Sequence, residues 1–154
     1  IQAQDLIGRK LRMNNGKAYQ SFVKIVEKTL SEFNEYPELL EFYGPLESAL
    51  AELNSSTEFV LARVRGDREE MGATGFEYMR IFGYAIMAWV WARMVLVAQE
   101  NSNASAPRLS KDFYQNKLTT ARFFYGHMLP MIWGHSATLK SDKTAMMALS
   151  EDQF

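Results

Sequence analysis

The stretch FEYMRIFGYAIMAWVWARMVLVAQ, residues 76–99, decides the fold of this chain. Between residues 81 and 98 it carries a single charged side chain, Arg93. A helix that is apolar on all sides must be enclosed by other helices, by a partner subunit or by lipid. The sequence therefore predicts a helical bundle with a buried central helix. What encloses that helix is the main functional question.

Amphipathic patterns on either side of this stretch predict the remaining helices. Apolar side chains recur at three- and four-residue intervals over residues 17–33, 46–64 and 110–132, which is the spacing of one helix face. No strand-like alternation and no internal repeat is present in the sequence. We therefore expect an all-α fold, an antiparallel four-helix bundle with a short N-terminal helical segment formed by residues 1–11.

Turn and capping residues predict where these helices begin and end. The triplet at residues 14–16, Asn-Asn-Gly, is a turn signal, and NSNASAP at residues 101–107 is the clearest loop. Ser110 is the expected N-cap of the last helix, which Pro130 should kink or bring to its final turns. We expect Pro45 to be the first residue of a helix, and Gly72 and Gly75 to precede the central one.

Composition limits the functions that this chain can have. With 154 residues and a formal net charge of −1, it is expected to form one domain without a strong field for nucleic acid or anionic lipid. The absence of Cys excludes disulfides and Cys-ligated metals and fits a reducing, cytoplasmic environment. No signal peptide is evident in the first ten residues. Because the chain begins with Ile1 rather than Met, we expect a fragment or a processed product.

A membrane span is an alternative for the central helix. Residues 81–98 reach the lower length limit for crossing a bilayer. Arg93 would cost about 2.5–3.5 kcal/mol near the bilayer centre on insertion scales, although it lies near one end of the stretch. The other predicted helices are amphipathic, as in a bundle. We therefore favour enclosure by protein over enclosure by lipid.

Catalytic and metal-binding patterns are missing from the sequence. The two histidines, His127 and His135, are eight residues apart, and neither has a Glu three positions before it, as a di-iron bundle requires. No glycine-rich phosphate loop and no Ser-His-Asp pattern is recognisable. We assign no catalytic residue and no metal ligand.

Charged side chains on the apolar helix faces are the candidate site residues. A buried cation must be paired, because an unpaired one costs several kcal/mol. We interpret five polar residues as structural locks that fix the helix register. For the cations among them there are two alternatives: a role facing an acyl chain or CoA, or plain exposure to solvent. They are Arg93, Glu77, Tyr114, Lys117 and Arg122.

An acidic run precedes the central helix. Residues 31–58 carry seven acidic and no basic side chains. This run is either a solvated face or a docking surface for a basic partner.

Several segments in order resemble a known family. IQAQDLIGRKL at residues 1–11 resembles the segment that follows the catalytic glutamate loop of FAD-dependent acyl-CoA dehydrogenases. FEYMRIFGYAIMAWVWARM, FYQNKLTTARFFYGHMLP and the terminal ALSEDQF resemble the C-terminal extension of the larger bacterial members, the subgroup similar to methylthiopropanoyl-CoA dehydrogenases. The resemblance spans essentially the whole chain.

The resemblance implies a reaction and a place for this chain in it. In the family a glutamate removes the α-proton of an acyl-CoA thioester, and a hydride from the β-carbon passes to flavin. Electrons then leave through an electron-transfer flavoprotein. Residues 1–13 would end a helix of the catalytic domain, and residues 14–154 would form a C-terminal four-helix accessory domain.

The catalytic glutamate and the flavin-binding body would then lie outside this chain. Its residues alone should not be a working dehydrogenase, and we expect no cofactor in them. Gln2 is the one candidate contact to FAD, and only in the full-length parent. Partners implied by the resemblance are the catalytic body of the same polypeptide and a second subunit of a homodimer.

Two functional hypotheses follow. The first is a C-terminal accessory and oligomerisation domain of an acyl-CoA dehydrogenase in fatty acid metabolism. The second is a free-standing helical interaction module whose hydrophobic groove accepts a partner helix or an acyl chain. A membrane-surface role ranks third, and nucleic-acid binding is not expected.

Overall fold

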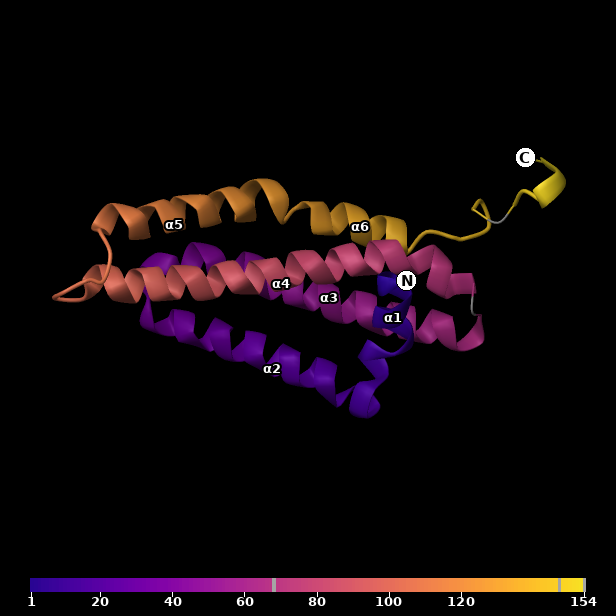
Figure 1. The fold of residues 1–154 in the computed structure, drawn as a ribbon, viewed down its shortest axis with the longest axis horizontal. Coiled ribbons are helices and arrows are strands. Elements are labelled where there is room, and N and C mark those ends of the chain that lie inside the picture. The colour runs from indigo at the N-terminus through magenta and orange to yellow at the C-terminus, as the bar shows by residue number, and fades with distance from the viewer. Residues whose placement is uncertain (68, 147, 154) are drawn as a thin grey trace.

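The computed structural model describes residues 1–67, 69–146 and 148–153, and this part of the chain is helical without strands (Figure 1). The expected all-α class is thus confirmed. Short 3₁₀ segments join some of the helices, and a π-helical turn, Phe124–Met128, lies between α5 and α6. The α-helices are α1 (Gln2–Gly8), α2 (Lys17–Glu32), α3 (Leu40–Gly66), α4 (Glu69–Asn103), α5 (Lys111–Phe123) and α6 (Met131–Leu139).

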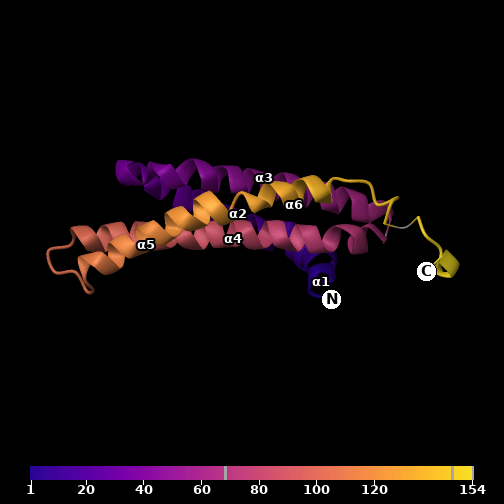
Figure 2. The same ribbon diagram turned by 90° about the horizontal axis from the view of Figure 1, so that it is seen from above.

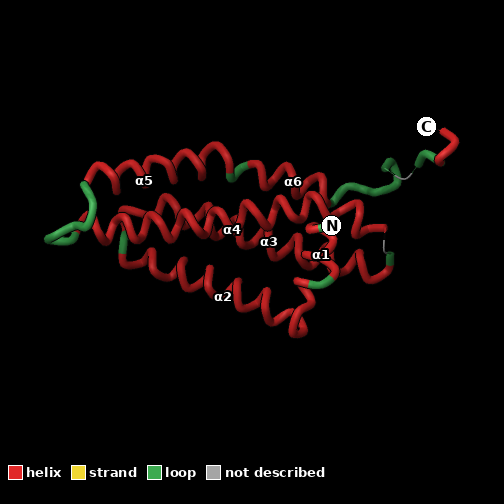
Figure 3. The backbone as a smooth tube through the Cα atoms, in the orientation of Figure 1, coloured by secondary structure: helices red, strands yellow, loops and turns green. Residues whose placement is uncertain are grey.

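The long helices lie side by side around one core. Seen as in Figure 1, α4 is in front of α3, the α5–α6 pair lies above them and α2 below, and the chain runs back and forth between the two ends (Figures 1 and 2). The loop from α4 to α5 lies at one end, whereas the end of α3 and the start of α4 lie at the other, as does the C-terminal segment (Figure 3). Helix α4 therefore contacts α1, α2, α3, α5 and α6.

The core is formed by apolar side chains from all six α-helices and from the short segments that join some of them. Large residues with almost no exposed surface meet inside it, and small residues of α4 let the neighbouring helices come close. The large residues include Phe33, Leu39, Phe42, Leu46, Leu53, Val60, Tyr78, Ile81, Ile132 and Leu139, and the small ones are Ala85, Ala88 and Ala92.

Several local predictions are confirmed. Asn14, Asn15 and Gly16 all have positive φ, as the turn signal requires. The Oγ of Ser110 accepts a hydrogen bond from the backbone N–H of Phe113 at 3.2 Å and caps α5.

Pro130 separates α5 and α6 as predicted. It lacks an N–H, and its ring cannot share space with the carbonyl four residues earlier in a regular helix. The preceding π-helical turn relieves this conflict: the N–H of Leu129 donates to the carbonyl of Phe124, five residues back, at 2.9 Å.

Two predicted boundaries are wrong. Helix α3 begins at Leu40, so that Pro45 lies inside the helix and is not its first residue. Burial of Leu39, Phe42 and Leu46 keeps the chain helical on both sides of the proline and offsets the lost backbone hydrogen bond.

The central helix also begins earlier than predicted. Helix α4 starts at Glu69, so Gly72 and Gly75 lie within it. Helix α1 explains Gly75: a Cβ there would come within 3.3 Å of the Cβ of Ala3, so the glycine lets α1 lie close against α4. A Cβ at Gly72 would meet no atom within 4 Å. The predicted tail at residues 145–149 includes Met147, which lies outside the described residues.

The contact between α1 and α4 predicts the effect of two glycine substitutions. Gly75→Leu should push α1 off α4 and destabilise the chain by about 1–3 kcal/mol, because overpacking a close contact has this cost. Gly72→Leu is the matched control, since it adds the same side chain to the same helix in open space. Hydrogen exchange of the backbone amides of residues 5–9 should become faster only in Gly75→Leu. Equal exchange in both variants would contradict the packing described.

Candidate functional site

The five residues predicted as polar locks fall into two overlapping groups. Arg93, Glu77 and Arg122 each form a polar contact between two helices. Arg93 also lines one surface hollow together with Tyr114 and Lys117.

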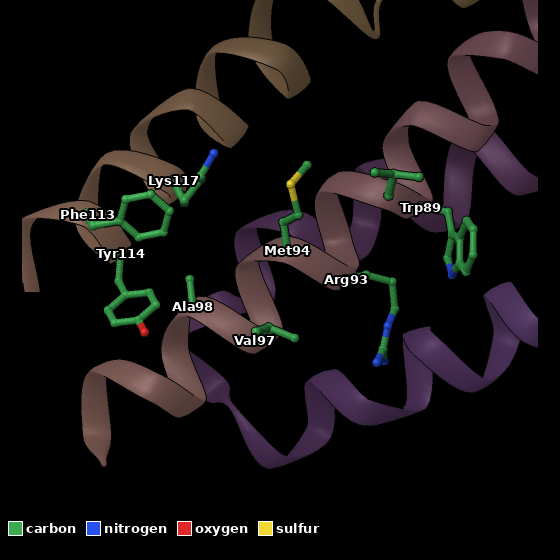
Figure 4. Close-up of a pocket in the computed structure, with 9 residues that line it drawn as sticks. Trp89, Arg93, Met94, Val97, Ala98, Phe113, Tyr114 and Lys117 are labelled. Atoms are coloured by element: carbon green, nitrogen blue, oxygen red, sulfur yellow. The ribbon is translucent and has the colours of Figure 1, made fainter. Parts of the chain in front are cut away.

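Arg93 of α4 forms an ion pair with Glu32 at the end of α2. The two side chains are 42% and 33% exposed, so the pair lies at the surface of the seam between the helices and not in the core. Arg93 and Trp89 both point toward α2 (Figure 4). The indole N–H of Trp89 donates to Thr29 of the same helix at 3.0 Å. Polar side chains of α4 thus contact α2 at two adjacent turns.

Glu77 and Arg122 join other helices. A carboxylate oxygen of Glu77 in α4 lies 2.6 Å from Nδ1 of His135 in α6. Arg122 in α5 donates hydrogen bonds to both carboxylate oxygens of Glu41 in α3. One of these oxygens, Oε1, accepts from Nε of Arg122 at 2.9 Å and from Nη2 at 2.7 Å. The sequence pattern does not indicate His135 or Glu41 as partners, because each lies more than fifty residues from the side chain it meets.

Tyr114 and Lys117 lie apart from these pairs, on α5. Tyr114 is buried, and its hydroxyl accepts a hydrogen bond from the backbone N–H of Leu109 at 3.2 Å. The ammonium group of Lys117 lies 5.3 Å from the centre of the Phe113 ring, a cation–π distance. Among the described residues no carboxylate forms an ion pair with Lys117.

The acidic run at residues 31–58 is used largely within the chain. Glu32 and Glu41 pair with arginines as described, and Glu52 with Lys140 at 3.1 Å. Glu38 accepts from the side-chain amide of Gln99 on α4. The run therefore connects α2 and α3 to the later helices. The two alternatives drawn from the sequence, a solvated face and a docking surface for a basic partner, did not include this role.

Glu52 is the most enclosed of these carboxylates, with 14% of its side chain exposed. Burial by itself raises the pKa of Glu52. The hydrogen bonds that its carboxylate accepts from Ser136, Lys140 and Ser56 outweigh this effect, and the pKa lies below the ordinary value of 4.5. Glu52 thus connects α3 to α6 in its charged form.

Two buried tyrosine hydroxyls also join helices. The Tyr78 hydroxyl in α4 donates to Thr57 of α3 at 2.7 Å, since the Thr57 hydroxyl itself donates to the carbonyl of Leu53. The Tyr125 hydroxyl donates to the carbonyl of Ala88 in α4 at 2.7 Å. Burial raises the pKa of Tyr78 and of Tyr125, so both remain neutral donors at physiological pH.

The outer face of α4 is apolar and is left uncovered by the other helices. An 18-residue window of this helix has a mean hydropathy of 1.7, long and apolar enough to cross a membrane, yet only 39% of the window is buried. Along this face seven exposed or half-exposed residues, six of them uncharged, follow each other at alternating intervals of four and three. We call them the outer row of α4: Phe76, Arg80, Gly83, Met87, Val90, Met94 and Val97.

Two hollows lie along the outer row, where α5 and the π-helical turn form the opposite wall. The first, of about 350 Å³, is lined by α4 from Trp89 to Ala98 and by Phe113, Tyr114 and Lys117 of α5 (Figure 4). The second, of about 360 Å³, is lined by α4 from Met79 to Met87 and by Phe124 and Met128. Both hollows lie along α4, and we call the two together the α4–α5 groove.

Cofactor-binding and metal-binding groups are not evident in the described part of the chain. No group of three or more His, Asp or Glu side chains is arranged to hold a metal among the described residues. Gln2 is exposed at the first position of α1 and lines neither hollow of the α4–α5 groove.

Fold and site together define a class of protein: a helical bundle tied by inter-helix ion pairs, with an apolar groove in place of a catalytic cluster among its described residues. The sequence model of the family described as acetyl-CoA dehydrogenase C-terminal like matches residues 22–150. The chain belongs to this family.

A curated relative agrees with the family assignment. The butyryl-CoA dehydrogenase of Syntrophomonas wolfei subsp. wolfei (strain DSM 2245B / Goettingen) is 21% identical over 153 residues, which are 99% of this chain and 25% of that protein. The chain therefore spans about a quarter of the length of the relative that it matches. The resemblance to acyl-CoA dehydrogenases is thereby confirmed at the level of the C-terminal domain.

Partial exposure of the Arg93–Glu32 pair predicts a weak thermodynamic coupling. A double-mutant cycle with Arg93→Met and Glu32→Gln should give about 0.2–1 kcal/mol, because exposed pairs are screened by water. The coupling should shrink further in high salt. Urea unfolding of the four proteins at low and high salt measures it. A coupling of about 3 kcal/mol or more would indicate a buried lock instead.

The lowered pKa of Glu52 predicts a dependence of stability on pH. The contribution of a carboxylate with a depressed pKa is fully present above its unfolded pKa, here 4.5, and is lost as the pH falls through the folded value. Glu52→Gln should therefore be less stable than the parent at pH 7, by about 1–2 kcal/mol, and approach it in acid.

Glu58→Gln is the matched control for this experiment, since Glu58 is exposed on the same helix. Urea unfolding at a series of pH values compares the three proteins. A difference between Glu52→Gln and the parent that stays constant as the pH falls below 4.5 would contradict a stabilising charge at Glu52.

Proposed function

We propose that this chain is the C-terminal accessory domain of an FAD-dependent acyl-CoA dehydrogenase, packed on the catalytic body and contributing to a homodimer. Match of the family model over residues 22–150 is the observation that carries this proposal. Alignment of nearly the whole chain with a quarter of a butyryl-CoA dehydrogenase supports it, because a domain of a larger polypeptide is expected to align in this way.

The groove on α4 also supports an accessory role. An uncovered apolar face of this length is unusual in a protein that acts alone, and such faces mark interaction sites. Covering it would remove apolar surface from water, at about 25 cal/mol per Å². The ion pairs among α2, α3, α4, α5 and α6 hold the helices that form this face in a fixed arrangement.

The chemical step is proposed for the rest of the polypeptide. In the parent enzyme a glutamate outside these residues would remove the α-proton of an acyl-CoA thioester, and bound FAD would accept the hydride from the β-carbon. We place FAD in the catalytic body of the parent, because both the family model and the curated relative belong to acyl-CoA dehydrogenases. Gln2, at the exposed end of α1, would at most add one hydrogen bond from the boundary of the domain.

The finer assignments are proposals on the same basis. We place the parent in the larger bacterial subgroup similar to methylthiopropanoyl-CoA dehydrogenases, acting in fatty acid metabolism in the cytoplasm. Its electron acceptor would be an electron-transfer flavoprotein. Within the parent, residues 1–13 would end the catalytic domain, and residues 14–154 would form the antiparallel four-helix accessory domain.

A free-standing interaction module is the alternative. Neither the family match nor the curated relative supports this alternative. The family is described as a dehydrogenase C-terminal domain, and the relative is a dehydrogenase. The α4–α5 groove is compatible with both functions, and it is the family match that favours the accessory role.

Truncation of the longer polypeptide tests the proposal. The intact protein should bind flavin and form a dimer. Deletion of residues 17–154 should abolish the dimer, because the surface that helps to form it is removed, while the 154-residue chain alone should bind no flavin. Visible flavin absorbance and light scattering measure both properties.

Helical circular dichroism of the truncated protein controls for loss of folding. Stoichiometric flavin on the 154-residue chain alone would overturn the accessory assignment. An unchanged dimer after truncation would overturn the role in assembly.

A further inference from the structure

We propose that the outer row of α4 is the docking site for an amphipathic helix that has an apolar seam flanked by acidic residues and that belongs to the dehydrogenase body outside these 154 residues. This inference rests on the proposed function and specifies which surface carries it. Three features of the structure support it: the spacing of the row, the charges beside it and the side of α4 on which α1 lies.

The spacing identifies the occupant as a helix. The outer row alternates intervals of four and three over 22 positions, from Phe76 to Val97, which is the heptad spacing of a helix–helix seam. At 1.5 Å per residue it runs straight for about 30 Å. A second helix lying nearly parallel to α4 would keep contact along this whole length, because the three–four ridges of both helices then interlock.

The hollows have the form that such a seam needs. They follow one another along α4, at residues 79–87 and 89–98, and are open to solvent along the row. Side chains that project from one face of a docked helix recur about every turn, and large apolar ones can enter both hollows. The small residue Gly83, exposed within the row, lines the hollow at residues 79–87 and allows the backbone of that helix to approach there.

Charges beside the groove define the flanks of the occupant. Arg80 and Lys117 line the two hollows, and among the described residues neither has a carboxylate partner within ion-pair distance. Each instead lies over an aromatic ring of its own helix, that of Phe76 at 5.1 Å and that of Phe113 at 5.3 Å. No Asp or Glu lines either hollow. Acidic residues beside an apolar seam would complement these two cations.

The same charges disfavour a second copy of this chain. Two copies joined along the outer row would bring identical basic grooves together, since neither hollow is lined by a carboxylate. Like charges placed opposite each other across an interface oppose association. An open groove likewise fits an acyl chain less well than a helix, because a lipid-binding site encloses most of its ligand.

Helix α1 lies on the side of α4 that is turned away from α3 (Figure 2). Its Ala3 packs against Gly75, one position before the first residue of the outer row. Residues that precede Ile1 in a longer protein of this family would thus approach α4 beside the row. We infer that the body to which they belong covers the groove.

A photo-crosslinking experiment in the longer polypeptide tests the inference. A benzophenone-bearing amino acid replaces Met87, which is 44% exposed in the middle of the row, and in a control protein it replaces Ile25, which is 50% exposed on α2. Irradiation followed by peptide mass spectrometry should link position 87 to a helix outside the 154 residues. The control should give no such link.

Charge reversal tests the acidic flanks. Arg80→Glu combined with Lys117→Glu should lower the crosslink yield from position 87 at least about fivefold, the factor that corresponds to roughly 1 kcal/mol. Lys24→Glu combined with Lys28→Glu is the matched control, with the same change of charge on exposed positions of α2. It should leave the yield unchanged. Equal effects of both pairs would overturn the charge complementarity.

Other crosslink products would overturn the inference. A link from position 87 to residues 1–154 of a second copy would identify a self-interface, and a link to a bound lipid would identify an acyl site. A crosslink yield from position 87 that is no higher than the yield from position 25 would show that the row remains uncovered. If truncation still abolishes the dimer while position 87 gives any of these results, the accessory function is retained and the docking site on α4 is rejected.

Discussion

Close packing along the inner side of α4 is the constraint on which the rest of the structure depends. Ala85, Ala88 and Ala92 follow one another at helical spacing and are buried, so the facing helices come near the α4 backbone. Tyr78 and Ile81 continue this face with large side chains that have no exposed surface. A larger residue at one of the alanines would separate α4 from its neighbours along the whole bundle.

Polar contacts select one register for this packing. Apolar faces alone tolerate sliding, whereas a buried hydroxyl without a partner costs free energy. The Tyr78–Thr57 and Tyr125–Ala88 hydrogen bonds therefore specify how α3 and the α5–α6 pair lie against α4. Outside the core, carboxylates from the acidic run repeat this role in ion pairs that are individually weak. In this way the face of α4 that the bundle leaves open has a defined shape.

The sequence predicted the helices well because their signals are local. Apolar periodicity, the Ser110 cap and the kink at Pro130 depend on neighbouring residues. Pro45 and Gly75 were misjudged because each is governed by contacts from elsewhere: buried side chains around the proline and α1 against the glycine. Tertiary packing overrides a local breaker signal in both cases.

The site was predicted only in part, for the same physical reason. The charged residues could be recognised, but their partners lie on other helices, as Glu32 does for Arg93 and His135 for Glu77. The outer row was hidden because residues 76–99 are apolar on every side. Hydrophobicity shows that such a helix must be covered, but it does not show which face the chain covers itself.

Oxidative footprinting of methionines tests the central claim most directly, namely that the outer row of α4 is covered in the full-length enzyme. Met87, in the row, and Met131, on α6, are both exposed in this chain. Both methionines should oxidise readily in the 154-residue chain. In the proposed full-length enzyme, Met87 should be strongly protected from oxidation relative to Met131. Equal oxidation of Met87 in the two proteins would contradict it.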